Sequence, residues 1–110
     1  MKISTLMSYA QGYVGATNEL IEYEKAGLDM VWIPEAYSFD GVSAMGYVAG
    51  RTERVQIASG ILNIYSRSPT LMAMTAAGLD ALSEGRFMLG LGASGPVSYT
   101  HLTLPTNREV

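Results

Sequence analysis

Short apolar runs alternate with longer amphipathic segments along most of this sequence. The apolar runs at 3–9, 30–33, 55–62 and 87–91 have the length of strands, and the segments between them carry apolar residues at helical spacing. The run at 30–33, Met-Val-Trp-Ile, contains no polar residue, which favours a strand buried on both faces. The pattern therefore predicts the element order βαβαβαβ.

Polar residues and glycines predict where the helices begin and end. Thr17 or Asn18 can cap the first helix, because their side-chain oxygens accept hydrogen bonds from early backbone N–H groups. Gly27 suits the left-handed position that follows the last turn of a helix. Asp40 can cap the second helix, and Ser68, which is followed by proline, can cap the third.

Strands that alternate with helices are typical of a parallel sheet with helical crossovers. Two α/β architectures fit this pattern: a doubly wound open sheet, and a (β/α)8 TIM barrel of about 250 residues. The pattern does not separate them. With 110 residues the chain can hold one small domain, so a barrel would be represented only by its N-terminal portion.

Composition narrows the classes of function. Hydrophobic residues make up 48% and charged residues 15%, which is typical of a folded core. A net charge of -3 without any basic run argues against a nucleic-acid partner. The sequence has no cysteine and a single histidine, His101, so we expect no metal site. It also lacks a signal peptide and any apolar run of the roughly 20 residues that span a membrane, so we expect a cytoplasmic protein without a membrane partner.

The C-terminal tail differs from the rest of the chain. Residues 97–110 show no helical period and contain His101. The string 97–106 resembles one reading frame of a transposase-type sequencing adapter, with a sample barcode after it; the alternative is an ordinary extended tail. We interpret 1–96 as the N-terminal part of a barrel domain and 97–110 as a non-native tail, so His101 is no catalytic candidate.

The candidate chemistry lies at the predicted strand ends, because parallel βα folds bind ligands beyond the carboxyl ends of their strands. Glu35, directly after an apolar strand, could contact a cofactor or substrate, or be a solvated or helix-capping carboxylate. Gly60 could allow a flat ring to approach, although a simple bulge is the plainer interpretation. The side chains of Tyr65 and Arg67 could line the same ligand site at the strand ends, or lie at the surface.

Residues 90–95, Gly-Leu-Gly-Ala-Ser-Gly, fit the dinucleotide-binding pattern G-x-G-x-x-G. That pattern normally lies in the first βα turn, whereas this one follows the fourth predicted strand. We therefore favour small residues that leave space for a ligand above a barrel strand.

Several of these segments together resemble the luciferase-like monooxygenase family, especially its coenzyme F420-dependent branch. The most specific is 75–92, with its run Leu-Asp-Ala-Leu-Ser-Glu-Gly-Arg-Phe-Met-Leu-Gly-Leu-Gly. The segments 31–37 and 51–55 are also typical, and 94–96, Ser-Gly-Pro, fits one subgroup. The resemblance covers essentially all of 1–95 and implies a truncated (β/α)8 barrel.

The resemblance also implies a reaction and a site. The reaction is hydride transfer between reduced F420 and an organic small-molecule substrate; the alternative is an FMN-dependent monooxygenase. A non-prolyl cis peptide is expected at Gly60–Ile61, behind the cofactor ring, and 92–94 match residues near the pyrimidine edge of that ring. Glu35, the one catalytic candidate, and Ala36 match an acidic-then-variable pair, although many relatives have histidine where Ala36 stands. The predicted cofactor-binding residues are Tyr9, Glu35, Ala36, Gly60, Ile61, Asn63, Gly92, Ala93 and Ser94.

A non-enzymatic alternative stays open. The chain could be a half-barrel that pairs with itself, with a native tail. A homo-oligomeric parent is compatible with either interpretation. If the chain is truncated, we expect it to be inactive and poorly soluble, because it has unpaired sheet edges and lacks the last strands, after which barrels usually bind phosphate.

The interpretation of the tail predicts what the source locus encodes. Amplification across the codon for Gly95, sequenced without a transposase-based library, should show a frame that continues for roughly two hundred residues, as a barrel of about 250 requires. If the read instead returns 97–110 followed by a stop, the self-associating half-barrel becomes the leading hypothesis.

Overall fold

The computed structural model describes residues 1–8, 10, 12–35 and 39–93. The predicted order of strands and helices is confirmed, except that the third and fourth predicted strands are each divided into two short strands. In chain order the elements are β1 (Ser4–Leu6), α1 (Tyr13–Lys25), β2 (Met30–Ile33), α2 (Gly41–Arg51), β3 (Gln56–Ser59), β4 (Leu62–Asn63), α3 (Pro69–Leu82), β5 (Phe87–Met88) and β6 (Leu91–Gly92).

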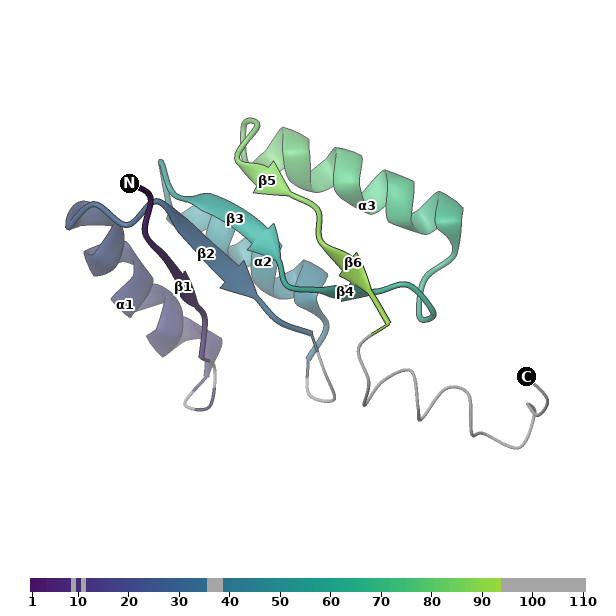
Figure 1. Ribbon diagram of the computed structural model, residues 1–110, viewed down its shortest axis with the longest axis horizontal. Helices are drawn as coiled ribbons and strands as arrows, with labels where there is room; N and C mark the ends of the chain where they lie inside the picture. Colours follow the sequence, from purple (N-terminus) through teal and green to yellow (C-terminus); the bar gives the residue numbers. More distant parts are fainter. Residues whose placement is uncertain (9, 11, 36–38, 94–110) are drawn as a thin grey trace.

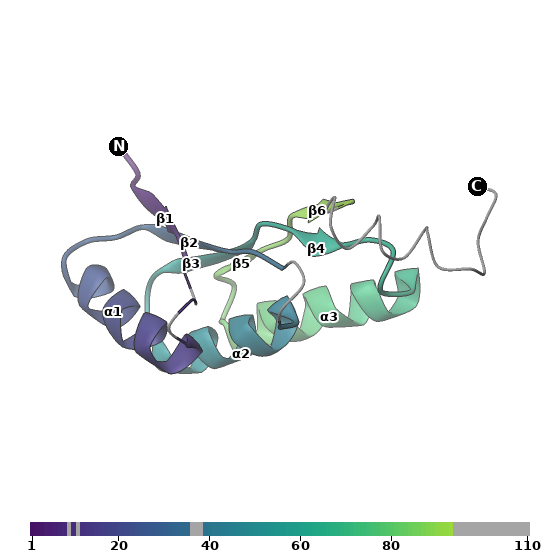
Figure 2. The same ribbon diagram turned by 90° about the horizontal axis from the view of Figure 1, so that it is seen from below.

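The order of the strands separates the two architectures that the sequence left open. The main sheet is parallel and runs β1-β2-β3-β5, without the reversal of order that defines a doubly wound fold. The strands β4 and β6 form a second parallel pair beyond the ends of β3 and β5 (Figure 1). All three helices lie on one face of the sheet (Figure 2). This is the arrangement of a segment of barrel wall, with helices outside and an open inner face.

The core lies between the sheet and the helices. Val31, Ile33 and Ile57 point from the strands into this layer and are at most 1% exposed, and Met45 and Val48 of α2 meet them there. The alternate residues of β2 are only half-buried, because no described element covers the inner face of the sheet. The prediction that 30–33 is buried on both faces is therefore wrong for the described chain.

Most of the predicted helix ends are confirmed. The carboxylate of Asp40 accepts a hydrogen bond from the Ser43 backbone N–H at 2.9 Å, and the Ser68 hydroxyl accepts one from the Leu71 N–H at 3.0 Å. Gly27 has φ 108°, the left-handed geometry expected directly after a helix.

The predicted start of α1 is wrong. The helix begins at Tyr13 instead of near Thr17, because Tyr13 and Ala16 pack against the core and extend the helix toward the N-terminus. Thr17 is consequently buried within the helix rather than capping it. Asn18 accepts a hydrogen bond from Arg51 of α2 through its side-chain oxygen, at 2.6 Å.

Arg86 ties the amino-terminal end of the sheet to the helices. Its guanidinium donates to the Thr52 hydroxyl at 2.9 Å and to the carbonyls of Val55, Ala49 and Ser83 at 2.8–3.0 Å. These contacts join the ends of α2 and α3 to the start of β3. They lie at the end of the sheet opposite to the carboxyl ends of the strands.

Gly90 lies between β5 and β6, and it allows this segment of the chain to approach β3 closely. The Ser59 hydroxyl donates to the Gly90 carbonyl at 2.8 Å and accepts from the Gly90 N–H at 2.7 Å. A Cβ atom at position 90 would lie 2.2 Å from the Ser59 carbonyl oxygen. Packing between neighbouring strands therefore explains the first glycine of the G-x-G-x-x-G pattern without a dinucleotide.

This close approach predicts the cost of adding one methyl group. The substitution Gly90→Ala should lower the free energy of unfolding by about 1–3 kcal/mol, because the backbone must move to relieve the overlap. The matched control is Gly78→Ala in α3, where an added Cβ meets nothing within 4 Å. That variant should be neutral or up to about 1 kcal/mol more stable, because alanine is the better helix former. Equal denaturant midpoints for the two variants would contradict the prediction.

Candidate cofactor site at the strand ends

Parallel strands bring their carboxyl ends to one edge of the sheet, where β2, β4 and β6 place several of the predicted site residues together. The register aligns Leu62 with Leu91 and Asn63 with Gly92. Ile61, Asn63, Gly92 and Ala93 are therefore neighbours on adjacent chain segments. Tyr9, Ala36 and Ser94 lie outside the described residues.

The Gly60–Ile61 peptide bond is cis, as the family resemblance implied. It separates β3 from β4, and the Gly60 N–H still donates to the Ile33 carbonyl of β2 at 3.0 Å. A Cβ atom at Gly60 would lie 3.1 Å from the Trp32 ring, so the flat ring that packs against this glycine is the protein's own indole.

Gly92 makes space for Ile61. A Cβ atom at position 92 would lie 2.9 Å from the Ile61 Cδ1 atom. Gly92 and Ile61 are both half-buried, and Ala93 is exposed. The two strand ends thus present a small surface of backbone and aliphatic groups that carries no charge.

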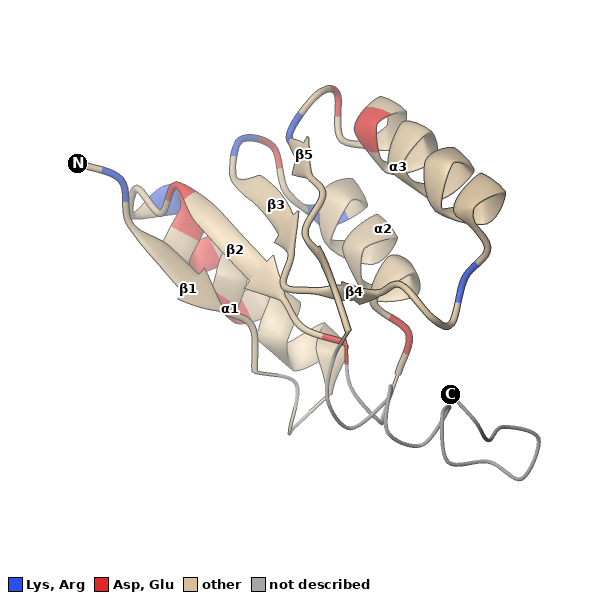
Figure 3. Ribbon diagram, turned by 45° about the vertical axis from the view of Figure 1, so that its right-hand side comes forward, with Lys and Arg blue, Asp and Glu red and all other residues tan. Residues whose placement is uncertain are grey.

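Behind this surface, Glu35 and Arg67 form an ion pair. The guanidinium of Arg67 donates from Nη1 to Glu35 Oε1 and from Nη2 to Glu35 Oε2, both at 2.7 Å. The side chains of Arg67 and Glu35 are only 10% and 7% exposed. Figure 3 shows the acidic position directly after β2 and the basic position before α3 on loops at this edge of the sheet. The interpretation of Arg67 as a surface residue is therefore wrong.

The carboxylate of Glu35 is also hydrogen-bonded to backbone. Oε2 accepts from the Gly41 N–H at 2.6 Å, at the start of α2, and Oε1 accepts from the Asn63 N–H at 3.3 Å. Its two oxygens thus accept at least four hydrogen bonds, which is about the capacity of a carboxylate. This geometry favours a structural role for Glu35 over direct chemistry on a substrate, and the prediction that it is catalytic receives no support from it.

The pKa of Glu35 reflects two opposing effects. Burial raises the pKa, but the hydrogen bonds from Arg67, Gly41 and Asn63 outweigh burial and hold it below its ordinary value. The pKa of Arg67 is raised, chiefly by its hydrogen bonds to Glu35. Both groups are therefore charged at neutral pH, and Glu35 holds no proton that it could donate.

Asn63 extends this network to the next strand. Its side chain is fully buried; Nδ2 donates to the Ala93 carbonyl at 2.7 Å, and Oδ1 accepts from the Tyr65 N–H at 2.8 Å. Polar contacts thus run continuously from Arg67 through Glu35 and Asn63 to Ala93. The sequence predicted that Asn63 binds the cofactor; in the structure, these two contacts of its amide are to the protein backbone.

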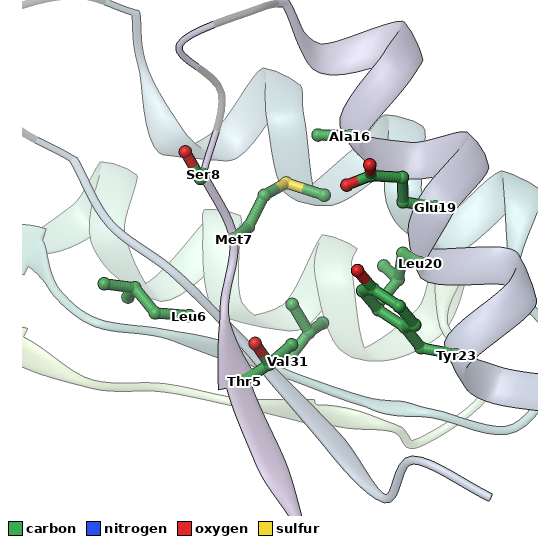
Figure 4. Close-up of a pocket in the computed structure, with 9 residues that line it drawn as sticks. All are labelled: Thr5, Leu6, Met7, Ser8, Ala16, Glu19, Leu20, Tyr23 and Val31. Carbon is green, nitrogen blue, oxygen red and sulfur yellow. The ribbon is translucent and has the colours of Figure 1, made fainter. Parts of the chain in front are cut away.

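A separate small pocket lies between β1 and α1 (Figure 4). Its volume is about 140 Å³, and Met7 and Val31 form part of its wall. The carboxylate of Glu19 and the hydroxyl of Tyr23 are the polar groups that α1 presents to it. None of the residues of the network from Arg67 to Ala93 lines it, so it is distinct from the candidate site.

Two other classes of site find no support in the described part of the chain. No group of three or more acidic, histidine or cysteine side chains there could hold a metal ion. Nor is any helix in the same ranges long and apolar enough to cross a membrane.

The lowered pKa of Glu35 predicts how stability responds to acid. A carboxyl whose pKa is depressed in the folded state stabilises the fold above its unfolded pKa, near 4.5, and this contribution is lost as the pH falls through the folded value. The substitution Glu35→Gln should lower the free energy of unfolding by about 3–5 kcal/mol at neutral pH, because it leaves Arg67 buried without its partner. The variant should then lose less stability than the wild type between neutral pH and the acid limit, as measured by urea unfolding. Parallel pH profiles for the two proteins would contradict this assignment.

The sequence is similar to one protein family and to several characterised or named proteins. The profile of the luciferase-like monooxygenase family matches residues 4–102. A Mycobacterium tuberculosis protein, provisionally named a coenzyme F420-dependent oxidoreductase, is 41% identical over 73 residues, which is 66% of this chain and 21% of that protein. The F420-dependent glucose-6-phosphate dehydrogenase of Kineococcus radiotolerans is 32% identical over 101 residues, which is 81% of this chain and 30% of that enzyme.

Solved structures share the fold. The coenzyme F420-dependent tetrahydromethanopterin reductase of Methanopyrus kandleri superposes with a TM-score of 0.82 at 23% identity, over 96% of this chain and 30% of that one. The oxygenating constituent of the Pseudomonas putida 3,6-diketocamphane monooxygenase, in complex with FMN, gives a TM-score of 0.79 at 20% identity, over 92% of this chain and 32% of that one.

The chain spans only about a fifth to a third of the length of these proteins. Within that span, the family profile covers nearly every residue, and the consecutive parallel strands with helices on one face reproduce the barrel wall of the solved structures. The chain belongs to the luciferase-like monooxygenase family.

Proposed function

We propose that this chain is the N-terminal part of an oxidoreductase that transfers a hydride between coenzyme F420 and an organic small-molecule substrate. The observation that carries the proposal is the identity of 31–41% to relatives whose names specify F420 or methylenetetrahydromethanopterin reduction. The proposal also includes a cytoplasmic location and no nucleic-acid or membrane partner.

The exposed apolar surface supports a larger parent protein. Leu82 and Met74 of α3 are 67% and 63% exposed, and Leu6 on the inner face of β1 is 62% exposed. An apolar groove of about 400 Å³ runs between α3 and β6, with Met72 and Leu91 among its walls. Further strands and helices of a barrel would cover such surfaces, as monomeric proteins rarely leave large apolar patches exposed.

The strand ends fit the ring of a deazaflavin. Gly60–Ile61 and Gly92–Ala93 offer backbone and aliphatic groups, and the charges of Glu35 and Arg67, which Asn63 links to this surface, are paired with each other. A flat, largely uncharged ring can pack on such a surface, whereas a phosphate would find no free cation in the described network. The cofactor would supply the hydride chemistry, and these residues would hold and orient its ring.

FMN is the alternative cofactor, since a solved relative of the same fold is in complex with FMN. That likeness is at 20% identity and concerns the fold. The residues at the strand ends offer backbone and aliphatic groups that could contact either tricyclic ring. Binding experiments must therefore separate the two cofactors.

The proposal predicts the preference of the complete protein in equilibrium dialysis. F420 and FMN are titrated separately against the product of the whole locus, and we expect stoichiometric binding of F420 and weaker binding of FMN. The 110-residue chain serves as a control, and we expect it to be poorly soluble and to bind neither. Preferential binding of FMN would move the assignment to a flavin monooxygenase. A soluble 110-residue chain of defined stoichiometry would instead support the self-associating half-barrel.

A further inference from the structure

The ends of β4 and β6 have few backbone contacts of their own. Each of these strands has two residues, and their pairing rests on hydrogen bonds such as Leu62 N–H to the Gly90 carbonyl at 2.9 Å and Ile64 N–H to the Gly92 carbonyl at 3.0 Å. A two-stranded sheet of this size is marginal by itself. Side chains must therefore help to fix where this surface lies.

The Glu35–Arg67 pair supplies that support from two neighbouring loops. Arg67 directly precedes the cap of α3, and Glu35 lies two residues after the end of β2. Two parallel charge-assisted hydrogen bonds fix the orientation of the carboxylate as well as its position. The same carboxylate then accepts from the Asn63 N–H of β4, and the Asn63 amide reaches the Ala93 carbonyl directly after β6.

We infer that Arg67 and Glu35 are positioning residues for the cofactor site, acting through Asn63 on the strand ends against which the ring packs. The inference rests on the proposed function, because it assumes that a ring lies on this surface. Neither residue needs to touch the cofactor. Their effect is to hold Asn63 where its amide reaches the Ala93 carbonyl, so that the surface exists before the cofactor arrives.

Arg86 provides a matched comparison within the same chain. It also makes several short hydrogen bonds, to Thr52, Val55 and Ala49 among others, but at the amino-terminal end of the sheet. In βα barrels, residues at the carboxyl ends of strands serve function, whereas those at the opposite end serve stability. Exchange of either arginine should weaken the fold, and only exchange of Arg67 should disturb the site.

The test compares Arg67→Lys with Arg86→Lys in the complete enzyme. Lysine keeps the charge but cannot make the planar two-point contact. We expect Arg67→Lys to raise the Kd for F420 by about 10- to 100-fold, the loss that removal of an outer-shell partner typically causes at metal sites. Arg86→Lys should leave the Kd within about twofold, because distant sites are nearly independent. The melting temperatures of both variants should fall.

Amide hydrogen exchange gives a second reading that does not depend on the cofactor. Arg67→Lys should speed exchange of the Leu62 and Ile64 amides, and Arg86→Lys should instead speed exchange of Ile57, whose N–H donates to the Arg86 carbonyl. If Arg67→Lys does not fold, Glu35→Asp keeps the charge but shortens its reach, and its Kd should rise in the same direction.

The outcomes distinguish the inference from the proposed function. A wild-type enzyme that binds no F420 overturns the proposed function, and the inference falls with it. A wild type that binds F420, with an Arg67→Lys variant that folds and binds equally well, overturns the inference alone. Equal losses of affinity in the two lysine variants also overturn it, because they would reflect stability and not position.

Discussion

A buried carboxylate must be compensated by hydrogen bonds or by an opposite charge. This constraint determines how the segments at the carboxyl ends of the strands are arranged. An uncompensated charge in the position of Glu35 would cost several kcal/mol, so the fold surrounds it with donors from three separate elements. The carboxylate thereby brings together Arg67, the start of α2 and the backbone of β4. The stabilisation from such a pair is modest compared with its hydrophobic equivalent. What it adds is a fixed geometry for segments that have little regular structure of their own.

The two ends of the sheet use polar contacts differently. At the amino-terminal end, Arg86 and Glu24 bind backbone groups of the turns that enter β3 and β5, and the Glu24 carboxylate accepts from three successive N–H groups at 53–55. Those contacts close the helix-to-strand turns. At the carboxyl-terminal end, the contacts join neighbouring strands instead, and they leave Ile61 and Ala93 accessible. Similar hydrogen-bonding chemistry thus holds turns at one end of the strands and neighbouring strand ends at the other.

The sequence predicted the local features well, because periodicity and capping depend on nearby residues. The strand at 30–33, the caps at Asp40 and Ser68, and Gly27 all follow from short patterns. The start of α1 could not be read in this way, because tertiary packing of Tyr13 overrides the cap signal at Thr17. The pairing of Glu35 with Arg67 was also missed. These residues are 32 positions apart, and only the parallel register brings their loops together. The available signal was that an acidic residue follows one predicted strand and a basic residue follows the next.

Different strands of a barrel contact different parts of a bound cofactor, so under the proposed function this segment would form only part of the site. Phosphate groups in such barrels are usually bound after the last strands, beyond the part of the chain described above. The surface at Gly60–Ile61 and Gly92–Ala93, by contrast, depends only on contacts among β2, β4, β6 and the loops beside them. This surface is therefore built by the first three βα units and the strand segments that follow them. Under the proposed function, this segment would contact the cofactor ring, while the rest of the barrel would supply the phosphate contacts.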